Sequence, residues 1–174
     1  MLGIKIVGCI FIICSCAGMG MHFSGELRSR IKDLTELKKL IHLLKGDIRY
    51  VHSPLPEAIQ TLSIRHDGKF KDFFKYVSNL LNEQGGLSFY SIWKVGVETK
   101  LGHTALIGKD FENLSRLGES LGYLDKEVQL NTLDLYIQHL EEEISELTKS
   151  VKEKSYMYNA LGIMGGLFVV IIMV

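Results

Sequence analysis

Hydrophobic residues follow two different patterns along this chain. Both ends are continuous apolar segments, whereas the middle places apolar residues three and four positions apart, the spacing that gives a helix one hydrophobic face. No stretch shows a sustained period of two with β-branched residues, and the prolines are Pro54 and Pro56. The pattern predicts an all-α protein: an antiparallel bundle of about six helices, flanked by N- and C-terminal transmembrane helices.

Two long heptad-like stripes begin and end the predicted bundle. The first consists of Leu34, Leu37, Ile41, Leu44, Ile48 and Val51. The second consists of Leu130, Leu133, Ile137, Leu140, Ile144, Leu147 and Val151. Each stripe needs a partner, so we expect the two helices to pair antiparallel as the spine of the bundle. The second helix is expected to start near Asp125 and to enter the membrane without a break.

Four shorter helices are predicted between these two. Ser53, the two prolines and Glu57 form a turn and helix start, and that helix ends near Arg65. A helix around residues 70–81 has an apolar face of Phe70, Phe73, Phe74, Val77, Leu80 and Leu81. Helices over 88–100 and 108–121 are expected to turn inward Phe89, Ile92 and Trp93, and Phe111, Leu114, Leu117 and Leu121, respectively.

The two apolar ends predict membrane spans. Residues 6–23 form an uncharged run of about 18 residues, nearly enough to cross a hydrocarbon core of about 30 Å. A cleaved signal peptide is the alternative for this segment. Residues 156–174 start with tyrosines and contain no charge, with a buried C-terminal helix as the alternative. The expected organisation is a transmembrane helix at 1–24, a helical domain at 25–155 and a transmembrane helix at 156–174.

Basic residues flank the middle domain on both sides. Arg28, Arg30 and Lys32 follow the first span, and Lys149, Lys152 and Lys154 precede the second. Cationic flanks mark the cytosolic side of a membrane, although Lys5 lies on the other side of the first span. The domain is therefore expected in the cytosol.

Composition and motifs give little indication of catalysis. Lys plus Arg and Asp plus Glu number 20 each, which provides no basic field for nucleic acid. Cys9, Cys14 and Cys16 all lie in the first apolar segment, and no phosphate-binding or zinc-binding motif occurs. His139 and Glu143 share a helix face that could hold a metal, but we interpret them as part of an exposed charged stretch. No catalytic, cofactor or metal residue is predicted.

Three segments together resemble the stage III sporulation protein AB family. They are SPLPEAI at 53–59, LGESLGYLDKEVQ at 117–129 and YNALGIMGGLFVVII at 158–172. Leu124 departs from the pattern, because a small hydroxyl residue that caps the last helix is expected there, and capping then falls to Asp125.

The resemblance implies a function for the chain. That family is similar to the cytoplasmic six-helix domain of the inner-membrane platform protein of type II secretion. It implies a non-catalytic platform subunit of a sporulation channel, in the mother-cell-derived outer forespore membrane with its domain in the mother-cell cytosol. The implied partners are a cytosolic secretion-type ATPase, other channel membrane proteins and the lipid bilayer, with homo-oligomerisation possible. A membrane-anchored coiled-coil tether and a membrane-bound enzyme are the alternatives.

A candidate partner-binding corner precedes the last long helix. Gly118 and Gly122 bracket a short segment where polar groups can be held rigidly at the surface. The candidate residues are Glu119, Tyr123, Asp125 and Gln129. The alternative is that this corner is only a helix C-cap followed by an N-cap.

Overall fold

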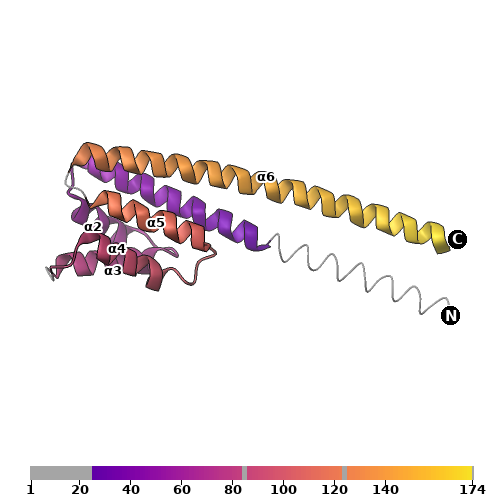
Figure 1. Cartoon of the computed structure of the whole chain (residues 1–174), viewed down its shortest axis with the longest axis horizontal. Helices are drawn as coiled ribbons and strands as arrows, with labels where there is room; N and C mark the ends of the chain where they lie inside the picture. The colour runs from indigo at the N-terminus through magenta and orange to yellow at the C-terminus, as the bar shows by residue number, and fades with distance from the viewer. Residues whose placement is uncertain (1–24, 84–85, 123–124, 174) are drawn as a thin grey trace. The chain divides into compact units, whose positions relative to one another are not determined.

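The computed structural model of the chain describes residues 25–83, 86–122 and 125–173, and the side chains as far as residue 153. A helix at residues 25–46 leads into the π-helical turn η1 (Asp47–Val51). Then follow α2 (Leu55–Arg65), α3 (Lys71–Asn82), α4 (Phe89–Lys100), α5 (Gly108–Leu121) and α6 (Lys126–Met173) (Figure 1). No strand occurs among the described residues, so the predicted all-helical class is confirmed.

The chain divides into two compact units. The larger unit is Lys32–Ile144, and the other consists of Met1–Ile31 with Ser145–Val174. In the larger unit, the helix at 25–46 and α6 are antiparallel, because the partners in two ion pairs change in opposite directions. Lys38 Nζ lies 3.4 Å from Glu141 Oε1, and Lys45, further along the first helix, pairs with Asp134, earlier in α6. The predicted spine is thus present in this unit.

The core of the larger unit contains most of both predicted stripes. Leu34, Leu37, Ile41, Leu44 and Ile48 are at most 1% exposed. Leu130, Leu133, Ile137 and Leu140 of α6 are also buried, and they bring apolar area to the same core. Aromatic rings complete it: Trp93 lies edge-on to Phe73 with ring centroids 4.9 Å apart, and Phe74 contacts both rings. Edge-to-face pairs of this kind add to the burial of apolar area.

The predicted core is wrong at Val51 and incomplete at several other positions. Val51 is 67% exposed, because the first helix changes to π-helical turns at Asp47 and ends at His52, whose φ is +62°. A wider turn shifts the angular position of each following side chain, so the heptad stripe no longer faces the core. Phe89 and Phe111 are only partly buried, whereas Ser78 and Asp110 are buried.

The smaller unit, Met1–Ile31 with Ser145–Val174, includes both apolar ends of the chain. Its described parts are helical, namely residues 25–31 and the continuation of α6 from Ser145 to Met173. The prediction that the last helix continues unbroken is confirmed, since α6 runs for 48 residues. The apolar segment at 1–24 and the side chains of 154–174 lie outside what the structure describes. Within the described residues, no helix is both long and apolar enough to cross a membrane. The two spans stay predictions.

Candidate functional site

The predicted docking corner joins the end of α5 to the start of α6. Glu119 is exposed in the last turn of α5 and Asp125 is exposed just before α6, while Tyr123 lies outside the described residues. Asp125 Oδ1 accepts the backbone N–H of Glu127 at 2.9 Å, so Asp125 is the cap of α6, as predicted. Gln129 Nε2 donates to the carbonyl oxygen of Leu121 at 3.0 Å. The corner is therefore held by side-chain hydrogen bonds to both helix ends.

Gly118 belongs to the packing of α5 and not to the exposed corner. It is buried, and a Cβ atom there would lie 2.1 Å from Cδ1 of Trp93. Trp93 Nε1 donates to the carbonyl oxygen of Leu114 at 2.8 Å, one turn before Gly118. The missing side chain lets the indole lie directly on the α5 backbone, which fixes α4 and α5 against each other.

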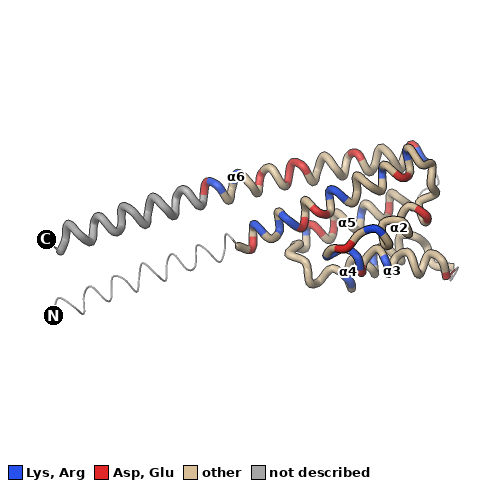
Figure 2. Tube along the Cα trace, turned by 180° about the vertical axis from the view of Figure 1, so that it is seen from behind, with Lys and Arg blue, Asp and Glu red and all other residues tan. Residues whose placement is uncertain are grey.

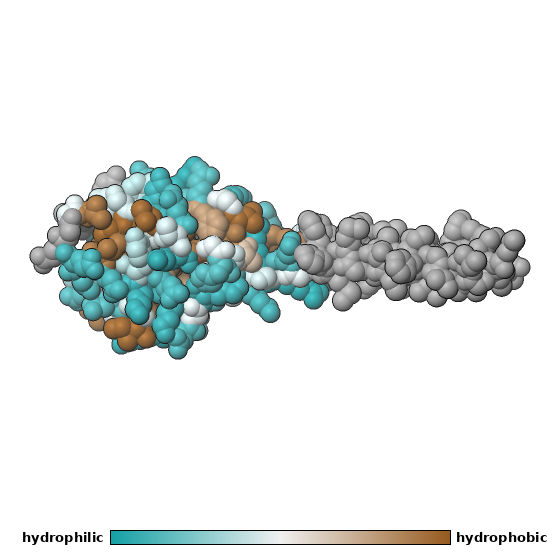
Figure 3. All heavy atoms as spheres, turned by 90° about the horizontal axis from the view of Figure 1, so that it is seen from below, coloured by the Kyte–Doolittle hydropathy of each residue, from teal (hydrophilic) through white to brown (hydrophobic). Residues whose placement is uncertain are grey.

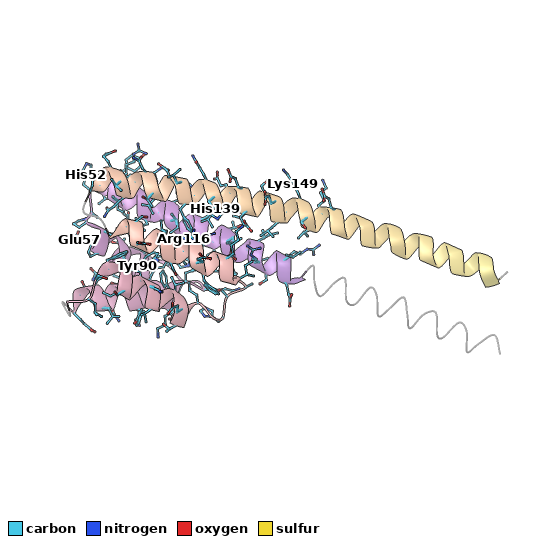
Figure 4. The ribbon with its side chains drawn as sticks, in the orientation of Figure 1. His52, Glu57, Tyr90, Arg116, His139 and Lys149 are labelled. Atoms are coloured by element: carbon cyan, nitrogen blue, oxygen red, sulfur yellow. The ribbon has the colours of Figure 1, made fainter. Side chains whose placement is uncertain are left out.

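A groove of about 420 Å³ lies between α4 and α5. Tyr90 and Arg116, which are labelled in Figure 4, are among the residues that line it. Phe111 and the ring of Tyr90 provide apolar surface in it, whereas Val97, which also lines it, is only 1% exposed. Charged side chains line it as well: Lys94 and Glu98 from α4, and Glu112, Arg116 and Glu119 from α5. Glu119 is thus shared by the predicted corner and the groove.

The pattern of residues along the sequence does not indicate this groove. Its signal is a four-residue spacing on each helix, with Tyr90, Lys94 and Glu98 on α4 and Ser115 and Glu119 on α5. Such spacing also describes an ordinary solvated helix face. Only the pairing of α4 with α5 makes the two faces into one groove.

A buried carboxylate holds together the connections at the other end of α4 and α5. Asp33 is 2% exposed and accepts from Lys69 Nζ at 2.7 Å and from the backbone N–H of Ala105 at 2.7 Å. Next to it, His66 Nε2 lies 2.8 Å from Glu36 Oε1, and His103 Nε2 lies 2.9 Å from the carbonyl oxygen of Lys69. The loops before α3 and α5 are thereby fixed to the first helix.

His139 and Glu143, the pair that the sequence offered as metal ligands, have structural partners. His139 Nε2 lies 2.9 Å from Asn113 Nδ2, and Glu143 accepts from Lys109 at 3.1 Å, so both residues contact α5. Over the described residues, no group of three His, Cys, Asp or Glu side chains could hold a metal ion. Burial, with the nearby charge of Asp110, raises the pKa of the Tyr136 phenol. Tyr136 does not line the groove.

Comparisons with known proteins agree on one family. The family model described as stage III sporulation protein AB matches residues 5–174. The stage III sporulation protein AB of Bacillus subtilis (strain 168) is 23% identical over 170 residues, covering 98% of this chain and 99% of that protein. A solved structure of a stage III sporulation protein AB superposes with a TM-score of 0.63 at 23% identity, covering 71% of this chain and 97% of that one. At this identity the superposition shows the fold.

Proposed function

This chain belongs to the stage III sporulation protein AB family, and from that premise we propose that it is a non-catalytic membrane platform subunit of a sporulation channel. The channel would resemble type II secretion machinery. In this function the helical domain binds a cytosolic secretion-type ATPase and connects it to the other membrane proteins of the channel. The work of the chain is then binding and positioning.

The observation that carries this proposal is the closed, filled bundle of the larger unit. A coiled-coil tether would present its heptad stripe to a partner, but here most of both stripes lies inside the domain, with Leu37, Leu44 and Leu133 completely buried. The helix surfaces instead carry charges of both signs (Figure 2). A self-contained domain with a polar surface is suited to reversible docking of partners.

A catalytic site would combine a pocket with convergent polar groups of perturbed pKa. Among the described residues with a shifted pKa, Tyr136 is a buried phenol, and Asp67, in the loop before α3, forms an exposed ion pair with Lys71 at the start of that helix. None of these three lines the α4–α5 groove. The groove thus supports binding better than chemistry.

Membrane placement is part of the proposal. The two apolar ends would span the mother-cell-derived outer forespore membrane, and the basic residues beside them would keep the domain in the mother-cell cytosol. Arg28, Lys149 and Lys152 are exposed, as a role beside lipid headgroups requires. A variant with Cys9, Cys14 and Cys16 replaced by serine and a single cysteine at Asn82 should resist an impermeant maleimide in intact cells and react after lysis. Labelling before lysis would overturn the orientation.

Binding of the ATPase tests the function itself. The full chain in detergent micelles should bind the purified ATPase of the same sporulation channel. Absence of binding by the wild-type chain would reject the platform function. At the predicted corner, Asp125→Asn removes the charge but keeps the helix cap, since Asn caps as well as Asp. We expect weaker binding of this variant at low salt and a smaller difference at high salt, because exposed charges are screened. Equal affinity at low salt would exclude Asp125 as a contact.

A further inference from the structure

Two loops of the larger unit lie beside the residues at which the chain enters and leaves it. Asp33, the second residue of this unit, accepts from Lys69 in the loop before α3 and from the N–H of Ala105 in the loop before α5, both at 2.7 Å. Lys109, at the start of α5, lies 3.1 Å from Glu143, one residue before the unit ends. These loops therefore form the end of the larger unit that the chain connects to its apolar segments, which we call the entry end.

The two ends of the larger unit carry opposite charge. At the entry end, five Lys and Arg residues stand against one Asp in the loops and adjoining helix ends at 65–71 and 100–109. At the opposite end of the unit (Figure 1), two Lys and Arg residues stand against five Asp and Glu in the connections at 47–54, 83–88 and 119–127. The entry end is thus basic, although Lys plus Arg balance Asp plus Glu over the whole chain.

Hydrophobic residues form separate small patches among hydrophilic ones on the face drawn in Figure 3, so patch size marks no docking surface there. Ile107 is set apart by its position at the entry end, directly before α5, where it is 46% exposed. Its backbone N–H donates to Asp110 Oδ2 at 3.0 Å, which fixes the residue, but its side chain cannot cap the helix as Ser, Thr, Asp or Asn would. The fold therefore gives no reason for an isoleucine at this exposed position.

Gly108, the neighbour of Ile107, is also not required by the fold. It is exposed, its φ lies outside the left-handed region, and an added Cβ would meet nothing within 4 Å. Glycine costs conformational entropy in a helix, so its presence without a local need indicates a close approach of something else to the backbone. Departures from local rules of this kind are expected at functional positions.

Chain length keeps the entry end near the bilayer in the membrane placement proposed above. The helical residues 25–31 extend about 10 Å and residues 145–155 about 16 Å, at 1.5 Å per residue. The headgroup layer takes up about 5–8 Å of each length. What remains is about 10 Å or less, comparable with the Debye length at physiological salt, so charges at the entry end interact with charged headgroups. Tether length and charge thus favour the same occupant, an anionic bilayer surface.

We propose that the entry end docks onto an anionic bilayer surface, with the side chain of Ile107 in the headgroup layer and Lys32 and Arg65 beside the lipid phosphates. Both cations are exposed and make no hydrogen bond or ion pair with any part of the chain that the structure describes. This inference rests on the proposed function, because the two membrane spans supply the tether. Docking turns the acidic end, with the predicted corner, towards the cytosol and its partners.

A fluorescent label at position 107 tests the contact in the full chain. Cys9, Cys14 and Cys16 are replaced by serine, Ile107→Cys is labelled with an environment-sensitive fluorophore, and single chains are placed in lipid nanodiscs. In nanodiscs that contain phosphatidylglycerol, the emission should shift to shorter wavelength and be quenched by nitroxide-labelled lipid. Leu87→Cys is the matched control, because this residue is 61% exposed in a loop at the opposite end, and its label should show neither effect.

Charge is tested separately with Lys32→Gln and Arg65→Gln in the labelled chain. Each change should lower the ratio of docked to free loop about fivefold, since each cation near an anionic surface contributes about 1 kcal/mol. Arg49→Gln and Lys94→Gln remove exposed cations outside the entry end and should leave the ratio unchanged. Circular dichroism confirms that every variant is folded.

The outcomes separate this inference from the proposed function. If the chain enters nanodiscs but the labels at 107 and 87 behave alike, the inference is overturned and the membrane placement stands. If the chain does not enter nanodiscs at all, both are rejected. An equal shift in neutral phosphatidylcholine nanodiscs overturns the part assigned to anionic headgroups. A shift that appears without lipid, in detergent micelles at high chain concentration, identifies a second copy of the chain as the occupant and overturns the inference.

Discussion

Replacing Gly118 by alanine tests the packing that positions both the corner and the groove. Alanine is a better helix former than glycine by about 1 kcal/mol, so propensity alone predicts a more stable protein. The structure predicts the opposite. The new methyl group would lie 2.1 Å from Trp93 Cδ1, far inside van der Waals contact, and the indole is fully buried.

The size of the effect follows from what must move. Trp93 cannot turn away without loss of its hydrogen bond to Leu114, worth about 0.5–1.5 kcal/mol, and of its packing against Phe73. Overpacking of a filled core typically costs about 1–3 kcal/mol. After the gain in helix propensity is subtracted, Gly118→Ala should destabilise the domain by about 2 kcal/mol. In a chain of this size that lowers the melting temperature by about 4–8 °C.

Trp93 is the single tryptophan of the chain, so its fluorescence reports directly on the changed contact. Thermal unfolding of the full chain in detergent micelles should show the loss, together with a shift in the emission of Trp93. Gly46→Ala is the matched control, because that glycine has helical φ and ψ and nothing within 4 Å of an added Cβ. It should be neutral or slightly stabilising. If Gly118→Ala melts at or above the control, the close contact of α4 and α5 is wrong.

Three further changes probe the bundle. Leu140→Asp should unfold the larger unit, because it places a carboxylate at a position that is 3% exposed. Leu135→Asp, at a position that is 67% exposed, should change the free energy of unfolding by less than about 0.5 kcal/mol. Equal melting temperatures of the two variants would refute the core assignment. Asp33→Ala should cost about 1–3 kcal/mol and speed hydrogen exchange at Ala105, whose N–H loses its acceptor; unchanged exchange would contradict this. Lys71 lowers the pKa of the exposed Asp67 carboxyl, so the pair stabilises the fold above the ordinary pKa of about 4 and loses this effect as pH falls through the lowered value. Asp67→Asn should therefore have a slightly lower melting temperature than wild type near pH 6, and the same melting temperature as wild type at a pH well below the lowered pKa of Asp67. A constant difference at all pH values would contradict the assignment.

Helix positions could be predicted from the sequence because each helix has its own apolar period and its own boundary residues. The proline start of α2, the α4 cap at Ser88 and the Asp125 cap act within a few residues of the chain. Val51 shows the limit of this reasoning. Its heptad position extrapolates an α-helix through residues that form a π-helical turn, and no residue in the stripe signals the change.

The groups that need the tertiary structure could not be predicted. Asp33 looks like a polar neighbour of the first stripe, yet it binds residues 36 and 72 positions away. The α4–α5 groove likewise needs two helix faces that are each ordinary when taken alone. Gly118 did stand out in the sequence, but its interpretation as part of an exposed corner missed the indole that covers it.

The motif residues on which the family resemblance rests pack in the core or cap helices in this fold. In the SPLPEAI segment, Leu55, Ala58 and Ile59 are buried, and in the LGESLGYLDKEVQ segment, Gly118 accommodates Trp93 while Asp125 caps α6. Motifs of this kind specify packing and helix ends, so they identify the bundle without identifying what binds it. Partner choice would depend instead on exposed groups such as Glu98 and Glu119, which pair with nothing in the described part of the chain. Surface variants at those positions are therefore the direct route from family membership to function.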